Sequence, residues 1–303
     1  IQSSIEGVRN ASLEDLTIMV NRRMDNFLKF GTTTIEAKSG YGLSTESELK
    51  SLEVLRNVSL KHEIDIVPTF MGAHTFPSEY SEDHESYVDL ICNEMIPAVA
   101  EQGIAKFCDV FCEKGYFNLK QTKRILNIGK IHNLTSRIHA DEFQDSGAAE
   151  LAGELNCISA DHLMAVNNIG ISSLAQNRVI GTLLPGTTFF LGSHRYAPAR
   201  KLIDAGVEIA LATDFNPGSS HIQSMPFILV LACLFLEMTI EEAIKASTWQ
   251  GAVSLGIEKT VGSIEIGKKA DIIIWDLDKP IDIVYLCPGD NINHVFKNGK
   301  QVI

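Results

Sequence analysis

R-I-H-A-D-E-F, at residues 137–143, is an apolar run that stops at polar side chains, and this pattern decides the fold. The same pattern returns in I-S-A-D-H-L at 158–163 and in I-A-L-A-T-D-F-N-P-G-S-S at 209–220. Each segment is typical of a buried strand that ends at a polar tip. The tips present imidazole and carboxylate groups, which suit a first-row metal and the proton transfers of hydrolysis.

Strand and helix patterns alternate along the whole chain. The predicted strands are continuous apolar runs, as expected for parallel strands covered by helices, and they span 32–39, 65–74, 107–115, 135–142, 157–164, 179–187 and 208–218. Helical patterns fill the intervals. Ser12 is a predicted helix N-cap, and Thr239 with Glu242 is a predicted capping box.

Seven strands are one short of a closed (β/α) barrel. We expect residues 1–260 to form a TIM-like (β/α)8 barrel whose first strand is missing from the chain, with an open doubly wound sheet as the alternative. The lack of G-x-G-x-x-G and the polar tips on many strands favour the barrel. Residues 261–303 change character and carry an Asn298-Gly299 turn. They predict a small C-terminal β subdomain, part of a composite β-sandwich.

Composition excludes several classes of protein. A net charge of −12 over 303 residues, with no basic run, argues against nucleic-acid binding. No apolar stretch is long enough to cross a membrane, and residues 1–10 lack the apolar region of a signal peptide. The six cysteines form no C-x-x-C pair, so we expect a reduced, cytoplasmic protein. A nucleophilic Cys112 is a minor alternative.

Four tip residues are candidates for the chemistry. His139 is a candidate metal ligand or a hydrogen-bonded core histidine, and Glu142 is a proton shuttle or a solvated loop acid. His162 has the same two interpretations as His139. Asp214 ends an apolar strand, where an unpaired carboxylate is costly, so we expect it to be buried and to ligate a metal.

Three loops are candidates for binding a substrate. Tyr41, in S-G-Y-G-L at 39–43, offers a phenol on a loop whose glycines would supply mobility, or else the loop is a plain connection. His74 ends its strand and could polarise a carbonyl. The turn at 216–220 is an anion-binding nest or an ordinary Pro-Gly turn.

Taken in order, E-A-K-S-G-Y-G-L, T-F-M-G-A-H, H-A-D-E-F, A-D-H-L and A-T-D-F-N-P-G-S resemble the imidazolonepropionase family of the amidohydrolase superfamily. The resemblance covers essentially the whole chain. It implies metal-dependent hydrolysis of 4-imidazolone-5-propanoate to N-formimidoyl-L-glutamate in L-histidine degradation. It also implies one zinc or iron ion, a small-molecule substrate, no nucleic-acid or membrane partner, and a homodimer.

The resemblance assigns roles to single residues. It implies that His139 and Asp214 ligate the metal and that Glu142, His162 and Asp214 are catalytic. The implied substrate-binding residues are Tyr41, His74, Glu142, Asn216, Gly218 and Ser219.

The sequence departs from the superfamily in one respect. The superfamily's first barrel strand ends in H-x-H, which supplies two further metal ligands, and these 303 residues contain no H-x-H. We therefore expect an N-terminally incomplete chain, so that the activity of this polypeptide is open. The alternatives are another mononuclear amidohydrolase, such as a heterocycle deaminase, and a non-catalytic small-molecule-binding protein on the same scaffold.

Overall fold

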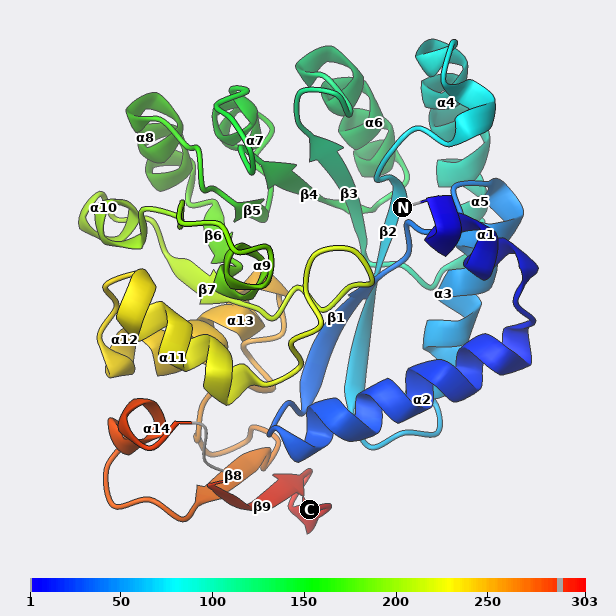
Figure 1. The fold of residues 1–303 in the computed structure, drawn as a ribbon. Helices are drawn as coiled ribbons and strands as arrows, with labels where there is room; N and C mark the ends of the chain where they lie inside the picture. Colours follow the sequence, from blue (N-terminus) through cyan, green and yellow to red (C-terminus); the bar gives the residue numbers. More distant parts are fainter. Residues whose placement is uncertain (1, 288–290) are drawn as a thin grey trace.

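The computed structural model describes residues 2–287 and 291–303 and contains two sheets (Figure 1). The larger sheet has seven parallel strands in sequential order, β1 to β7. They span Thr34–Lys38, Asp65–Ala73, Phe107–Cys112, Thr135–Ala140, Ser159–His162, Ile180–Leu183 and Ile209–Leu211. Because the order never reverses, the doubly wound alternative is wrong, and the predicted (β/α) barrel is confirmed as a curled sheet with β1 and β7 at its edges.

Helices cover the outer face of this sheet (Figure 1). The helices before β4 are α1 Gln2–Asn10, α2 Leu13–Lys29, α3 Thr45–Ser59, η1 Ser78–Tyr80, α4 His84–Leu90, the π-helical η2 Ile91–Met95, α5 Ile96–Gln102 and α6 Leu119–Ile131. The later ones are α7 Ala148–Glu154, α8 Asn168–Asn177, α9 Pro185–Phe190, α10 Ala199–Asp204, α11 Met225–Phe235, α12 Ile240–Ser247, α13 Trp249–Ser254 and α14 Asp282–Tyr285.

The predicted caps form as expected. The Ser12 hydroxyl accepts the Asp15 N–H at the start of α2. Thr239 and Glu242 each accept the other's backbone N–H at the start of α12, which is a complete capping box. These bonds satisfy N–H groups that a helix start otherwise leaves without partners.

The strands are shorter than predicted at their carboxyl ends. The predicted strand 179–187 ends at Leu183, because Pro185 begins helix α9, where a missing N–H costs nothing. The predicted strand 208–218 spans only Ile209–Leu211. The polar residues that follow these strands therefore lie in loops.

The C-terminal β subdomain is confirmed as a three-stranded antiparallel sheet, with the order β10-β9-β8. Its strands are β8 Ile272–Trp275, β9 Ile292–Lys297 and β10 Lys300–Gln301. The predicted Asn298-Gly299 turn joins β9 to β10, with positive φ at both residues. The sheet lies at the end of α2 opposite to α1 (Figure 1). The domain boundary near residue 260 stays a prediction.

Candidate active site

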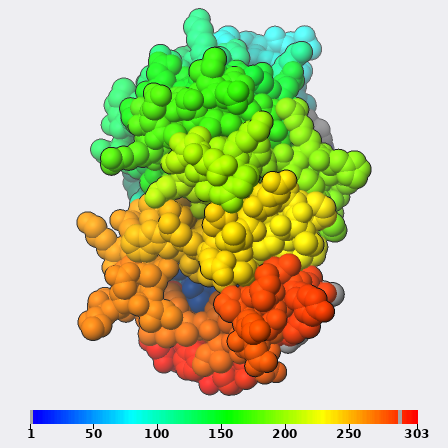
Figure 2. Space-filling model, turned by 90° about the vertical axis from the view of Figure 1, so that its left-hand side faces the viewer, coloured from blue at the N-terminus to red at the C-terminus, as the bar shows by residue number. Residues whose placement is uncertain are grey.

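All nine predicted site residues line one cavity of about 1030 Å³. They come from the carboxyl ends of β1, β2, β4 and β5 and from the loop after β7, and they are Tyr41, His74, His139, Glu142, His162, Asp214, Asn216, Gly218 and Ser219. The cavity continues to the C-terminal subdomain, where Ile273 and Ile283 line it. Figure 2 shows a hollow on that side, between the orange segment and red-orange α14. The volume suits a small organic substrate.

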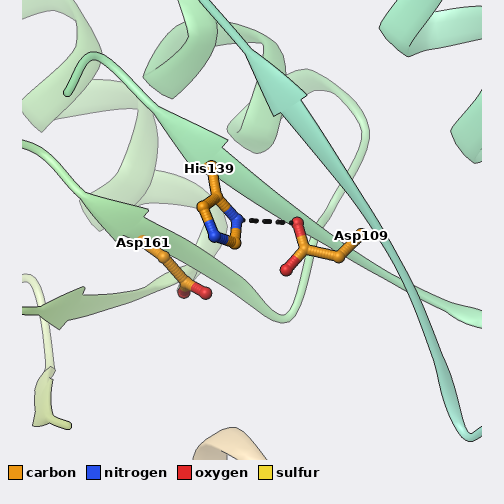
Figure 3. Close-up of side chains that lie close together, drawn as sticks. All are labelled: Asp109, His139 and Asp161. Atoms are coloured by element: carbon orange, nitrogen blue, oxygen red, sulfur yellow. Dashed lines mark hydrogen bonds and ion pairs between the residues drawn. The ribbon is translucent and has the colours of Figure 1, made fainter. Parts of the chain in front are cut away.

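His139 lies on β4 and is held from one side. Its Nδ1 is 3.1 Å from Oδ1 of Asp109 on β3, and Figure 3 marks this contact. The side chain of Asp109 is fully buried, and Lys38 donates a hydrogen bond to its Oδ2 at 2.7 Å. Burial opposes ionisation of both partners. Even so, Asp109 raises the pKa of His139, and the His139 and Lys38 charges hold the pKa of Asp109 well below its usual range.

Glu142 and His162 face each other across the site. The Nε2 atom of His162 lies 3.6 Å from Oε2 of Glu142, and both residues are buried. Burial raises the pKa of Glu142 to about 7, and the Glu113 carboxylate adds to this effect. Burial also lowers the pKa of His162 to about 4, against the pull of Asp214. At neutral pH the histidine is therefore neutral, and Glu142 is poised to take up or release a proton.

The loop that carries Glu142 is fixed by two buried carboxylates. Glu113, at the end of β3, accepts the Lys114 N–H on one oxygen and the Phe143 N–H on the other, both at 2.9 Å. Asp141 has a φ of +50° and accepts N–H groups at the start of α7, including that of Ala149. Glu142 lies between these two anchors, so its backbone position is set on both sides.

Asp214 is half-buried in the loop after β7, with a φ of +50°, so the expectation of a buried strand end is wrong. The Thr187 hydroxyl from α9 donates to its Oδ2 at 2.5 Å. Asn216 Oδ1 accepts the N–H groups of Gly218 and Ser219 at 2.8 and 2.7 Å. These two amides are engaged within the turn, which therefore presents side chains to the cavity and not the free backbone nest.

Tyr41 and His74 pack against each other. Their ring centroids are 4.9 Å apart at 85°, and Nδ1 of His74 lies 2.9 Å from the Gly40 carbonyl oxygen. Burial lowers the pKa of His74 to about 4, so the ring is neutral, donates its Nδ1–H to Gly40 and keeps an acceptor at Nε2. Burial raises the pKa of Tyr41, whose hydroxyl therefore stays protonated.

The S-G-Y-G-L loop is tightly held, contrary to the expected mobility. Buried Glu48 accepts the N–H groups of Gly42 and Leu43 at 3.0 and 2.9 Å. Arg9 donates to the carbonyl oxygens of the same two residues at 2.7 and 3.2 Å. The glycines are needed for shape: Gly40 has a φ of +110°, and an added Cβ there would lie 2.7 Å from the Met71 carbonyl oxygen.

Some functional candidates lie inside the strands and were missed. Glu36, Lys38, Asp109, Arg137 and Asp161 form a charged cluster beside His139, with Lys38 at its centre. Charged residues inside apolar runs, such as F-C-D-V-F-C at 107–112, are the signal that could have found it. The reactive-cysteine alternative is wrong, because burial raises the pKa of Cys112 to about 11.

The donor atoms at His139 and Asp214 fit part of a metal site. His139 is engaged through Nδ1, and Asp214 through Oδ2, so among the described residues no hydrogen bond occupies His139 Nε2 or Asp214 Oδ1. One imidazole nitrogen and one carboxylate oxygen are ligands that zinc and iron accept. A second candidate group, Asp109, His139 and Asp161, offers ligand atoms within 4.8 Å of one another. Within residues 2–287 and 291–303 no helix has the length and apolar character needed to span a membrane.

Comparison with known proteins places this architecture in a class. The amidohydrolase family profile matches residues 124–302. A 5-methylcytosine deaminase from Klebsiella pneumoniae superposes with a TM-score of 0.80 at 15% identity, covering 98% of this chain and 76% of that one. A zinc-bound adenosine deaminase from Xanthomonas campestris gives a TM-score of 0.73 at 17% identity, covering 96% and 70%. The fold and the family profile thus define a metal-dependent amidohydrolase.

Whole-chain identity narrows the class. An imidazolonepropionase from Alkaliphilus metalliredigens is 46% identical over 303 residues, which is 100% of this chain and 72% of that protein. The chain belongs to the imidazolonepropionase family.

Proposed function

We propose that this protein hydrolyses the cyclic amide of 4-imidazolone-5-propanoate to N-formimidoyl-L-glutamate, a step of L-histidine degradation. The observation that carries the proposal is the 46% identity to an imidazolonepropionase along the entire chain. The cavity supports it, because the nine residues that the family resemblance assigns to the site all line that one space.

His139, through Nε2, and Asp214 would hold the metal ion, zinc or iron. Such an ion, when bound, acts as a Lewis acid that activates water and polarises the ring carbonyl. The pairing of Asp109 with His139 Nδ1 leaves Nε2 as the ligating nitrogen. The Thr187 hydroxyl orients the Asp214 carboxylate through its Oδ2.

Glu142 is the proposed general base and acid. With a pKa of about 7, its carboxylate accepts a proton from the attacking water at neutral pH and returns it to the departing ring nitrogen. His162 is neutral and lies 3.6 Å from Glu142, so it orients the carboxyl group and the ring without adding charge. Asp214 is the second acid close to this path, since its charge acts on His162.

Tyr41, His74 and the turn at 216–219 are the proposed substrate contacts. Nε2 of neutral His74 is an acceptor and suits an N–H of the imidazolone ring. The protonated hydroxyl of Tyr41 suits the propanoate, together with the Asn216 and Ser219 side chains. Neutral donors of this kind select by hydrogen bonding and shape, with no charge to be desolvated.

The test uses the protein expressed from its complete gene and 4-imidazolone-5-propanoate. Ring opening is followed by the loss of ring absorbance and by mass spectrometry of the product. Glu142→Gln should retain metal and lose at least about 100-fold in kcat, whereas His139→Ala should lose metal. Glu101→Gln, at an exposed position, is the matched control. Wild-type protein that binds the compound without opening it, or that releases ammonia from other heterocycles instead, would overturn the proposal.

The remaining parts of the proposal concern the setting of the enzyme. We infer that it acts in the cytoplasm as a homodimer, with no nucleic-acid or membrane partner. The net charge of −12 supports the exclusion of nucleic acid, since phosphate binding requires a basic surface. Light scattering of the purified protein measures the oligomeric state directly.

A further inference from the structure

The charged cluster beside His139 spans three strands. Lys38 on β1 contacts Glu36 at 2.8 Å, Asp109 at 2.7 Å and Asp161 at 3.5 Å. Arg137 on β4 lies 3.2 Å from Glu36 and 3.7 Å from Asp161. Three carboxylates thus surround two cations in the barrel interior.

Asp109, His139 and Asp161 invite interpretation as a metal site, because their ligand atoms lie within 4.8 Å of one another (Figure 3). The two cations argue against it. Lys38 already bonds Oδ2 of both aspartates, and a dication placed among them would face the ammonium and the Arg137 guanidinium at short range. Arginine cannot release its proton to relieve that repulsion.

We propose that Asp109 is a positioning residue that fixes the tautomer of His139, and that Asp161 is not a metal ligand. The inference rests on the proposed role of His139 in holding the metal. Ionised Asp109 is only an acceptor, so at 3.1 Å its Oδ1 receives the Nδ1–H of His139. The Nε2 lone pair is thereby left to ligate. Lys38 holds the carboxylate in place through Oδ2, which prevents it from turning toward the cavity.

Asp109→Asn tests this arrangement. Lys38 is only a donor, so the new amide oxygen must face Lys38, and the amide NH₂ then faces Nδ1 of His139. That geometry moves the imidazole proton to Nε2 and blocks ligation. We expect zinc affinity, measured by chelator competition, to fall about 10- to 100-fold. The visible absorption of the Co²⁺-loaded protein should weaken in parallel.

Asp161→Asn is the matched control. It makes the same change of charge next to the same lysine, but Asp161 has no printed hydrogen bond to His139 and accepts one from Ser159. Zinc affinity should stay within about threefold of wild type. If Asp161→Asn loses as much affinity as Asp109→Asn, both act as ligands and the inference is overturned.

A measurement on wild type covers the case in which Asp109→Asn does not fold. Long-range ¹H–¹⁵N spectra of histidine-labelled, zinc-loaded protein report which nitrogen of His139 carries the proton, with assignment by His139→Gln. A proton on Nδ1 is expected, and a proton on Nε2 overturns the inference. Wild type that binds no zinc would instead overturn the proposed function itself.

Discussion

Glu142 is the residue whose placement most clearly disfavours stability. Burial raises its pKa from an ordinary 4.5 to about 7, so the folded protein holds a proton that the unfolded chain releases near pH 4.5. Stability from this group is present at low pH and is lost as the pH rises through 7. Glu142→Gln is neutral at every pH. Its stability relative to wild type should therefore be about 2 kcal/mol more favourable at pH 8 than at pH 5.

Urea unfolding of chelator-treated protein at the two pH values measures this difference. Glu101→Gln, which is exposed, should show no such change with pH. An equal stability difference for Glu142→Gln at pH 5 and pH 8 would mean that the carboxyl group is solvated in the folded protein.

Glu113 sets the position of Glu142 through the backbone. Both of its oxygens accept a buried N–H, from Lys114 and Phe143. Glutamine has one acceptor oxygen, so Glu113→Gln leaves one of these N–H groups facing an NH₂ group and displaces the loop. We expect kcat for ring opening to fall at least about tenfold with little change in KM, because misplaced catalytic groups are costly. A kcat within twofold of wild type in steady-state assays would contradict this role.

At the scale of elements, the loop at 39–43 depends on one glycine. In Gly40→Ala the new Cβ would lie 2.7 Å from the Met71 carbonyl oxygen at a φ of +110°. The shift should break the bond from His74 to the Gly40 carbonyl and raise KM about tenfold, through loss of the ordered ring. Gly103→Ala is the control, since φ there is +66° and nothing lies within 4 Å of the new Cβ. That variant should lose about 1 kcal/mol of stability and keep its KM.

The strands and their order could be predicted because each is a continuous apolar run between helical patterns. Their carboxyl ends could not, because apolar character continues past the last paired residue, as in the run from Leu184 into α9. The polar tips were recognisable one at a time. The charged cluster was not, since the contact of Lys38 with Asp109 joins residues 71 apart and depends on the register of three strands. Sequence reasoning likewise assigned mobility to a loop that Glu48 and Arg9 hold in place.

At the scale of the whole molecule, Lys297 joins the small sheet to the large one. Its side chain is fully buried and pairs with Asp65 at the start of β2 and with Asp271 just before β8. Lys297→Met removes the shared cation and leaves Asp271 buried without it, so we expect a loss of about 3 kcal/mol in the free energy of unfolding. Lys300→Met breaks the exposed pair with Glu63 and should change it by less than about 1 kcal/mol. Similar losses for both variants in urea unfolding would refute the anchoring role.

The carboxylates that clamp the site loops have a consequence for hydrogen exchange. The amide hydrogens of Gly42, Leu43 and Phe143 lie outside the regular strands and helices, where exchange with deuterium is usually fast, yet each is bonded to buried Glu48 or Glu113. They should exchange as slowly as amides within the sheet, even without substrate. Catalysis in this enzyme would then begin from a site that is already ordered before the ligand arrives.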